Sequence, residues 1–460
     1  MCGLAGAFLS GDATDPSVVE SAVHLMCNRM QARGPDAAGY WRDSEAGLSL
    51  GHRRLSILDL ESRANQPMHS EDGRYVIVFN GEIYNFRELR RVLERDGEVF
   101  RTQSDTEVLL KLYARDGVGM LSRLRGMFAF AIWDRRARSV FLARDPYGIK
   151  PLYIGRSKDG WLFASQVKAL LASGLVSYDS DPQGQAGFWL LGSVPEPRTW
   201  FRDISALPAG SWCRITADGQ LDGPHQYWDI GDSWRNAPEC RLTQGEAQEV
   251  VRAAVSESVR QHLVADVPVG VFLSGGIDSG SLAGLIKDTG VSGMQGITIA
   301  FNEFQGRHEN EAPVAAEIAR NYGIRHHVRT ITRQEFEADL PRILSAMDQP
   351  SIDGINTWYA SKAVAELGLK VVISGVGGDE LFYGYPSFQQ LPRLVSRWQS
   401  LSRIPGVRPA ANLALGLLAR RSGNPRWRWL PRQAGNLYGA YWLRRGLFAP
   451  DELPELMGEI

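Results

Sequence analysis

The strongest constraint on the fold is an alternation of apolar strands and helices that begins at about residue 243. Apolar residues four positions apart from Val251 to Leu263 predict a helix, and a continuous apolar strand follows it. Strands without a polar face, separated by helices, are typical of a parallel sheet that is covered on both sides. We therefore predict a doubly wound parallel sheet in the second half of the chain, with strands at Val269–Leu273, Gly296–Phe301, His326–Thr330 and Lys370–Ile373.

The first half has a different pattern, in which turn residues bound short β segments. Two helices are predicted among them, because Asn85–Glu88 and Ser104–Glu107 each have the form of a capping box before an apolar face. Many strands with few helices indicate an α+β layered domain. The chain is therefore predicted to be α/β overall, with a first domain over residues 2–205, closing strands and a polar linker over 206–242, and a second domain over 243–460.

The composition argues against several classes of protein. Lys and Arg number 51 against 52 Asp and Glu, so the net charge of −1 gives no electrostatic reason to expect a nucleic acid partner. The four cysteines are too few for a disulfide scaffold, and none forms a CxxC pair. No apolar run reaches the length of about 18 residues that a membrane span needs, and the N-terminus lacks the basic region of a signal peptide. We expect a cytoplasmic protein without a membrane span.

Cys2 directly follows the initiator methionine. Removal of Met1 would place the Cys2 thiol beside a free α-amine, whose ordinary pKa of about 8 suits a base for that thiol. A histidine base is then unnecessary. Taken alone, Cys2 is better explained as a small apolar residue at the start of a strand, because structural cysteines outnumber catalytic ones.

Seven segments, spread over the first 150 or so residues, add to the evidence for a catalytic Cys2. Together they resemble the glutaminase domain of the class II, N-terminal-nucleophile glutamine amidotransferases, which implies an αββα layered fold. In chain order the segments are MCGLAGAF at the N-terminus, RGPD (Arg33–Asp36), GHRRLSILD (Gly51–Asp59), FNGEIYN (Phe79–Asn85), SDTE (Ser104–Glu107), GMFAFAIWD (Gly126–Asp134) and RDPYGIKPLY (Arg144–Tyr153).

This resemblance implies that Cys2 attacks the side-chain amide of glutamine and releases ammonia through a thioester. The side-chain N–H of Asn80 and the backbone N–H of Gly81 would form the oxyanion hole, where negative charge develops. Each residue also has an ordinary structural interpretation, as a helix cap, a surface residue or a turn. The implied glutamine-binding residues are Arg54 for the α-carboxylate, Glu82 and Asp105 for the α-ammonium, and Leu55, Ile57, Asn80 and Gly81.

A glycine-containing turn, SGGIDS (Ser274–Ser279), separates the strand that begins at Val269 from the next helix. Such a turn exposes backbone N–H groups at a helix N-terminus and suits a phosphate. It differs from the GxxxxGK[ST] loop, and it resembles the pyrophosphate loop of enzymes that cleave ATP to AMP and pyrophosphate. Asp278 would then be a ligand of Mg²⁺.

A second glycine-rich turn, SGVGGDE (Ser374–Glu380), follows the strand that ends at Ile373. It resembles the second nucleotide loop of the asparagine synthetases, and Asp379 would share Mg²⁺ with Asp278. The Asp379-Glu380 pair is also compatible with simple stabilisation of a helix N-terminus. The implied ATP-binding residues are Phe272, Ser274, Gly275, Gly276, Asp278, Ser279, Ile299, Ser374 and Gly375.

Both halves together resemble the glutamine-hydrolysing asparagine synthetases over about residues 2 to 390. The chain departs from that family at Val376, because the family often has an acidic residue there. It also has no lysine after Lys370, whereas the family carries a later Gly-Lys element. We therefore expect either a chain that is short at its C-terminus or another group in the role of that lysine.

The resemblance implies an ATP- and Mg²⁺-dependent ligase that amidates a carboxylate with ammonia from glutamine, and suggests a homodimer. Aspartate is the expected acceptor. The segment Asp348–Gly354, where the family places its acceptor-side loop, would suit aspartate or another acid such as a sugar acid. The alternatives are a glutaminase with an inactive or incomplete synthetase, and a non-catalytic ATP-binding remnant, which the intact motifs disfavour.

The segment from Leu381 to Pro450 contains 11 arginines and no lysine or acidic residue. It could form a basic face for a membrane surface or a polyanion. We favour the simpler interpretation of a helical region whose acidic partners lie elsewhere.

Overall fold

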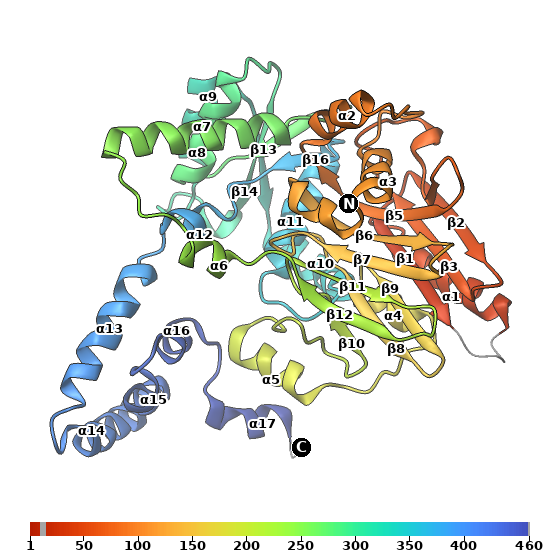
Figure 1. The fold of residues 1–460 in the computed structure, drawn as a ribbon. Coiled ribbons are helices and arrows are strands. Elements are labelled where there is room, and N and C mark those ends of the chain that lie inside the picture. The colour runs from red at the N-terminus through yellow and green to blue at the C-terminus, as the bar shows by residue number, and fades with distance from the viewer. Residues whose placement is uncertain (10–14, 459–460) are drawn as a thin grey trace.

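The N-terminal half contains two six-stranded antiparallel sheets, as described for residues 1–9 and 15–458 by a computed structural model (Figure 1). In the first sheet the strand order is β10 (Ile204–Ala206), β8 (Tyr153–Ser157), β9 (Gly160–Ala164), β1 (Gly3–Leu9), β3 (Leu48–Arg54) and β2 (Ala37–Asp43). In the second it is β12 (Leu221–Gln226), β11 (Ser211–Ile215), β7 (Ser139–Arg144), β6 (Gly126–Asp134), β5 (Tyr75–Ile83) and β4 (Met68–His69).

The two sheets bury a shared apolar layer that includes Leu50, Val78 and Trp133. Helices α1 (Pro16–Arg29) and α4 (Val167–Ala172) cover the outer face of the first sheet through a second apolar cluster. Helices α2 (Phe86–Arg95) and α3 (Asp105–Asp116) cover the second sheet in the same way. The order of layers is helix, sheet, sheet, helix, which confirms the predicted αββα fold.

The predicted capping boxes formed only in part. Ser104 caps α3, because its hydroxyl accepts from the Thr106 N–H at 3.1 Å, but Glu107 instead accepts from the backbone of Arg101 and Thr102. Asn85 begins α2 without a side-chain cap. Its side-chain amide instead donates to the carbonyl of residue 123 and accepts from the N–H of residue 125. A tertiary contact has therefore replaced the local one that the pattern predicted.

The C-terminal half is built on a four-stranded, wholly parallel sheet in the order β15 (Arg325–Ile331), β14 (Gln295–Phe301), β13 (Val269–Phe272) and β16 (Val371–Ile373). Helices α7 (Gln244–His262), α8 (Ile277–Asp288) and α9 (Ala312–Tyr322) pack through one apolar cluster. Helices α10 (Arg333–Ala346) and α11 (Gly354–Glu366) pack through two others. The doubly wound prediction is confirmed.

The strand order of this sheet also locates a crevice. After β13 the chain adds β14 and then β15 on one side, whereas β16 returns to the other side of β13. The order therefore reverses beside β13, and ligands of open α/β sheets bind beyond the carboxyl ends of the strands at such a point. The loops after β13 and β16 are the two predicted glycine-rich turns.

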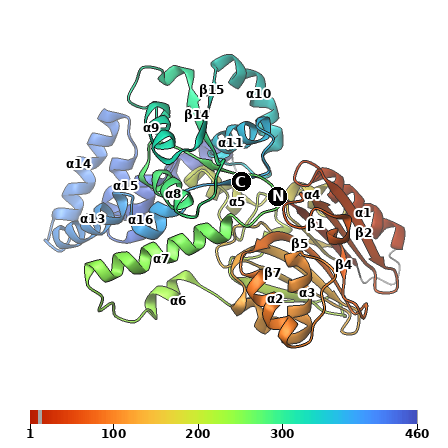
Figure 2. The ribbon, with the colours of Figure 1, turned by 90° about the horizontal axis from the view of Figure 1, so that it is seen from above.

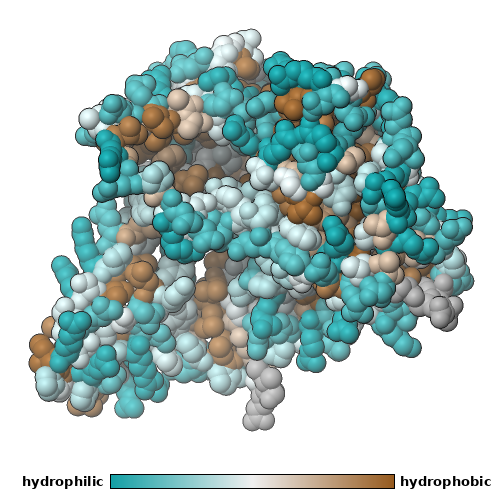
Figure 3. All heavy atoms as spheres, viewed as in Figure 1, coloured by the Kyte–Doolittle hydropathy of each residue, from teal (hydrophilic) through white to brown (hydrophobic). Residues whose placement is uncertain are grey.

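The remaining helices lie outside these two units, and Figure 2 shows the two units side by side. Helices α13 to α16 form an arm that extends away from the parallel sheet in Figure 1 and carries patches of hydrophobic surface in Figure 3. Among the described residues, no helix is long and apolar enough to cross a membrane. The remaining helices are α5 (Pro182–Leu191), α6 (Ile230–Arg235), α12 (Gly378–Phe382), α13 (Ser387–Leu401), α14 (Val407–Ser422), α15 (Arg426–Gln433), α16 (Leu437–Arg445) and α17 (Leu453–Met457), with 3-10 turns at Ser62–Ala64, Gly117–Arg123, Asn302–Phe304 and Pro450–Glu452.

Candidate active site

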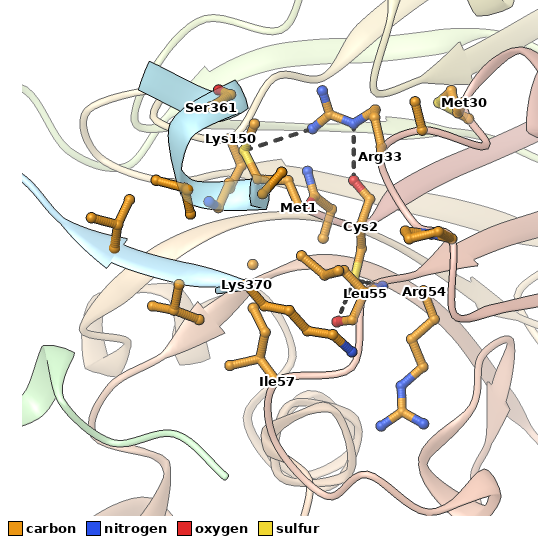
Figure 4. Close-up of a pocket in the computed structure, with 18 of the residues that line it drawn as sticks. Met1, Cys2, Met30, Arg33, Arg54, Leu55, Ile57, Lys150, Ser361 and Lys370 are labelled. Carbon is orange, nitrogen blue, oxygen red and sulfur yellow. Dashed lines mark hydrogen bonds between the residues drawn. The ribbon is translucent and has the colours of Figure 1, made fainter. Parts of the chain in front are cut away.

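Cys2 lies directly before β1, at the edge of a cavity of about 1410 Å³ (Figure 4). Its Sγ accepts from the Leu55 N–H at 3.3 Å, and its carbonyl accepts from Arg33 Nε at 3.0 Å. Burial raises the pKa of the thiol, and the Leu55 backbone opposes this rise. Burial also lowers the pKa of the adjacent α-amine, that of Met1 in the chain described here, to about 6. The thiol therefore lies beside a buried amine that here belongs to Met1, at the position where removal of Met1 would free the α-amine of Cys2.

Asn80 and Gly81 lie on β5 and line the same cavity. The Asn80 side chain is buried, yet neither its Nδ2 nor its Oδ1 has a hydrogen-bond partner among the described residues. A buried amide without partners is costly, and folded proteins rarely keep one that serves no purpose. A glutamine amide oxygen that accepts from Asn80 Nδ2 would satisfy this group, as an oxyanion hole requires.

Two carboxylates, Glu82 and Asp105, also line this cavity. Burial, with a smaller contribution from the Asp105 charge, raises the pKa of Glu82 to about 7. Burial raises the pKa of Asp105 to about 6, although its carboxylate accepts from the Ile83 N–H at 3.0 Å. A buried acidic pair of this kind is expected to attract a cation such as the α-ammonium of glutamine.

Arg54 ends β3, Leu55 and Ile57 follow in the next loop, and all three line the same cavity. The Arg54 guanidinium points away from Cys2 in Figure 4 and is engaged by its own loop. Its Nη1 donates to the Glu61 carbonyl at 2.9 Å and to Asn65 Oδ1 at 2.8 Å, and its Nη2 donates to the carbonyls of residues 58 and 59. Arg54 therefore organises the loop at residues 58–65 as well as lining the cavity.

The first nucleotide loop joins β13 to α8. The hydroxyls of Ser274 and Ser279 lie 2.9 Å apart across the turn, and Ser274 Oγ accepts from the Gly276 N–H. These contacts fix the conformation of the loop before α8. The N-cap residue of α8 is Gly276, which has no side chain to cap the helix. The uncapped helix N-terminus is available to phosphate oxygens.

The second nucleotide loop, after β16, meets the first at Asp278. A Cβ atom added at Gly375 or Gly378 would collide with the Asp278 side chain, which therefore lies against this loop. Asp379 follows directly and lines the same cavity. Two carboxylates from two loops fit Mg²⁺, which takes one or two protein carboxylates together with phosphate oxygens and water. Among the described residues no group of three or more metal-ligating side chains occurs.

All the predicted ATP-binding residues line a second cavity, of about 820 Å³. Phe272 and Ile299 contribute its apolar wall, and Val376, in place of the acid that the family often has, is almost fully exposed at its mouth. The two cavities share five lining residues, namely Phe272, Asn356, Ala360, Ser374 and Val376. The Cys2 cavity and the nucleotide cavity therefore lie next to each other and share part of their lining.

Sequence reasoning missed three charged residues of these cavities. Arg33 binds the Cys2 carbonyl, and burial lowers the pKa of Lys150, which lines the Cys2 cavity. Glu311 accepts from the Gly275 N–H at 3.3 Å and so places a third carboxylate in the nucleotide cavity. Arg33 and Lys150 could have been predicted from the sequence, because they lie inside the motifs RGPD and RDPYGIKPLY, respectively.

The segment that is expected to meet the acceptor, Asp348–Gly354, begins with contacts between the two domains. The Asp348 carboxylate accepts from the N–H groups of Val167 and Lys168, at 2.8 and 3.0 Å, and Gln349 accepts from Trp200. The beginning of this segment therefore joins the two domains.

The fold and the two joined cavities define a class of protein in which an amide hydrolase with an N-terminal nucleophile is coupled to a nucleotide-binding domain. A family model described as glutamine amidotransferase domain matches residues 1–228, and one described as asparagine synthase matches residues 250–456. The chain belongs to the family of the glutamine-hydrolysing asparagine synthetases.

Three relatives illustrate the range of the family. Glutamine-hydrolyzing asparagine synthetase 1 of Bacillus subtilis is 37% identical over 392 residues, which are 85% of this chain and 60% of that protein. A putative glutamine-hydrolyzing asparagine synthetase 2 of Methanocaldococcus jannaschii is 30% identical over 84% of this chain and 76% of its own. The amidase chry2 of Gibberella zeae is 34% identical over 83% of this chain and 57% of its own. The chain thus spans about 60% of the length of the Bacillus relative.

Proposed function

We propose that this chain hydrolyses glutamine at Cys2 and passes the ammonia to a carboxylate that ATP has activated in the second domain. The observation that carries the proposal is the wall that the Cys2 cavity shares with the cavity of the two nucleotide loops. A glutaminase without a synthetase would have no need for this shared wall.

In the first reaction, after removal of Met1, the α-amine of Cys2 takes the proton of the Cys2 thiol, and the thiolate attacks the side-chain amide carbon of glutamine. Asn80 Nδ2 and the Gly81 N–H stabilise the oxyanion. Collapse to the thioester releases ammonia, and water then releases glutamate. Glu82 and Asp105 hold the α-ammonium, and Arg54 provides the positive charge for the α-carboxylate.

In the second reaction, a carboxylate oxygen of the acceptor attacks the α-phosphate of ATP and releases pyrophosphate. The loop at Ser274–Ser279 binds the phosphates. Asp278 and Asp379 would hold Mg²⁺, which would neutralise the charge of the phosphates. Ammonia then displaces AMP from the activated carbonyl to form the amide. Residues of α11 (Trp358, Ala360, Ser361 and Val364) line the Cys2 cavity, and Ala360 also lines the nucleotide cavity.

Aspartate is the proposed acceptor, because the chain belongs to the asparagine synthetase family. An alternative acceptor is supported by two observations. Val376 supplies no charge beside the nucleotide loops, and one relative is named as an amidase. The homodimer and the cytoplasmic location stay predictions.

The deciding experiment measures pyrophosphate release from ATP and Mg²⁺ with aspartate, with glutamine or with ammonium chloride as nitrogen source. Asparagine formed with both sources supports the whole proposal. A Cys2→Ala variant is the matched control and keeps only the ammonia reaction. Glutamate formation without pyrophosphate would overturn aspartate as the acceptor for this chain, and hydrolysis of glutamine by Cys2→Ala would overturn the nucleophile.

A further inference from the structure

The loop that carries the glutamine-binding residues, Arg54–Asp59, is held from outside by the synthetase domain. The Asp59 N–H donates to Asp266 Oδ2 at 2.8 Å, and the Asp266 N–H donates back to the Ile57 carbonyl at 2.9 Å. Asp266 lies between α7 and β13, and is thus part of the other domain. This reciprocal pair fixes the loop at two points.

A second contact reaches the same loop through Asp36. Lys370 Nζ lies 2.7 Å from Asp36 Oδ2, and the same carboxylate oxygen accepts from the Ser56 N–H at 2.8 Å. Lys370 directly precedes β16, and Figure 4 shows it extending past Leu55 and Ile57. Lys370 and Asp266 therefore hold the loop from neighbouring strands, because Val371 pairs with Val269 in the sheet.

Apolar packing strengthens the Asp266 contact. Val264, two residues earlier, packs with Leu58 against the core of the glutaminase domain, and the His262 ring lies 4.1 Å from the Tyr84 ring between their centroids. The segment 262–266 is therefore packed on the glutaminase domain at His262 and Val264, which places the exposed Asp266 beside the loop.

The backbone of Asp59 needs such support. Its φ of 47° lies in the left-handed region, which non-glycine residues rarely adopt. The Asp59 and Leu58 carbonyls in turn accept from Arg54 Nη2. A chain of hydrogen bonds therefore runs from Asp266 through the Asp59 backbone to the guanidinium that supplies the positive charge for the glutamine carboxylate in the proposed function.

We infer that Asp266 and Lys370 are positioning residues for glutamine, so that two residues of the synthetase domain set the affinity of the glutaminase site. They touch neither the thiol nor the oxyanion hole, so they act on binding of glutamine and leave the chemical step nearly unchanged. The inference rests on the proposed function, because it concerns the same glutamine site.

The test compares glutaminase kinetics of the full-length variants Asp266→Ala and Lys370→Met in the absence of ATP. Loss of one hydrogen bond from a partly exposed group should raise KM for glutamine about fivefold in each variant, with kcat within about twofold. Asp266→Asn keeps an oxygen acceptor for the Asp59 N–H and should restore KM. Asp288→Ala is the matched acidic control, since Asp288 pairs only loosely with Arg252 on the outer surface.

Calorimetric titration of glutamine into the same variants on a Cys2→Ala background separates affinity from turnover, and should show the same fivefold change in Kd. Thermal unfolding identifies a variant that has failed to fold, and Lys370→Met, at an exposed position, is then the decisive one. If the unmodified chain hydrolyses glutamine and both variants keep its KM, the inference is wrong. If the unmodified chain does not hydrolyse glutamine, the proposed function itself fails.

Discussion

Replacement of Glu82 by Gln should stabilise the protein while weakening its binding of glutamine. Burial holds the pKa of Glu82 near 7, above its usual value of 4.5, so the folded protein retains this proton at pH values where the unfolded chain has lost it. Stability is therefore lost as the pH rises from about 4.5 through 7. At about 1.4 kcal/mol per pH unit, the ionised Glu82 costs about 3 kcal/mol above pH 7.

The assay is urea unfolding of the unmodified protein and Glu82→Gln at pH 4 and pH 8, without glutamine. Gln carries no charge, so the variant should gain up to about 3 kcal/mol at pH 8 and little at pH 4, where Glu82 is protonated in both states. Equal stabilities at pH 8 would refute the argument, because they would mean that Glu82 is not ionised in an unfavourable environment.

The kinetic half of the experiment has the opposite sign. Glutamine brings an α-ammonium that offsets the Glu82 charge, so Glu82→Gln should raise KM at pH 8 by about tenfold or more. In the unmodified protein, KM should rise as the pH falls below 7 and Glu82 takes up its proton, and the variant should lose this dependence. If Glu82→Gln keeps the pH dependence of KM, the group that titrates is Asp105 instead.

Three further substitutions separate the two sites. Asn80→Ala removes one oxyanion donor and should lower glutaminase kcat by about 10²- to 10³-fold with little change in KM, as steady-state kinetics would show. Cys2→Ser should lose glutamine-dependent amide synthesis and keep synthesis from ammonium chloride, which amino acid analysis of the product would detect. Asp278→Asn should abolish Mg²⁺-dependent pyrophosphate release and leave the release of glutamate from glutamine intact, because the residue lies in the nucleotide cavity.

The fold was predictable where its signal is local. The four parallel strands were each located to within two residues at either end, because unbroken apolar runs between helices are typical of strands that are buried on both faces. Helix α1 was missed, although Asp15-Pro16 is a helix start and Val19, Val23 and Met26 form its buried face. Helices in this half were predicted only where the form of a capping box precedes an apolar face, and α1 has no capping box.

The site was predictable to the extent that its residues lie in motifs. Cys2, Asn80, Glu82 and Asp105 come together in one cavity, and the two glycine-rich loops meet in another. The Asp266 contact carries no such signal, because one aspartate in a polar turn resembles any other. Only the packing of the two domains gives it a role.

The arrangement of β13 and β16 bears on how the two sites are spaced. At the amino ends of these strands Asp266 and Lys370 hold the glutamine-binding loop, and at the carboxyl ends Ser274 and Ser374 begin the nucleotide loops. The strands are four and three residues long, and a strand rises about 3.3 Å per residue. A short stretch of rigid sheet therefore separates the two loops, with the shared cavity wall beside it. In the proposed function, such a spacer would keep the cavity that receives ammonia in a fixed relation to the cavity that releases it.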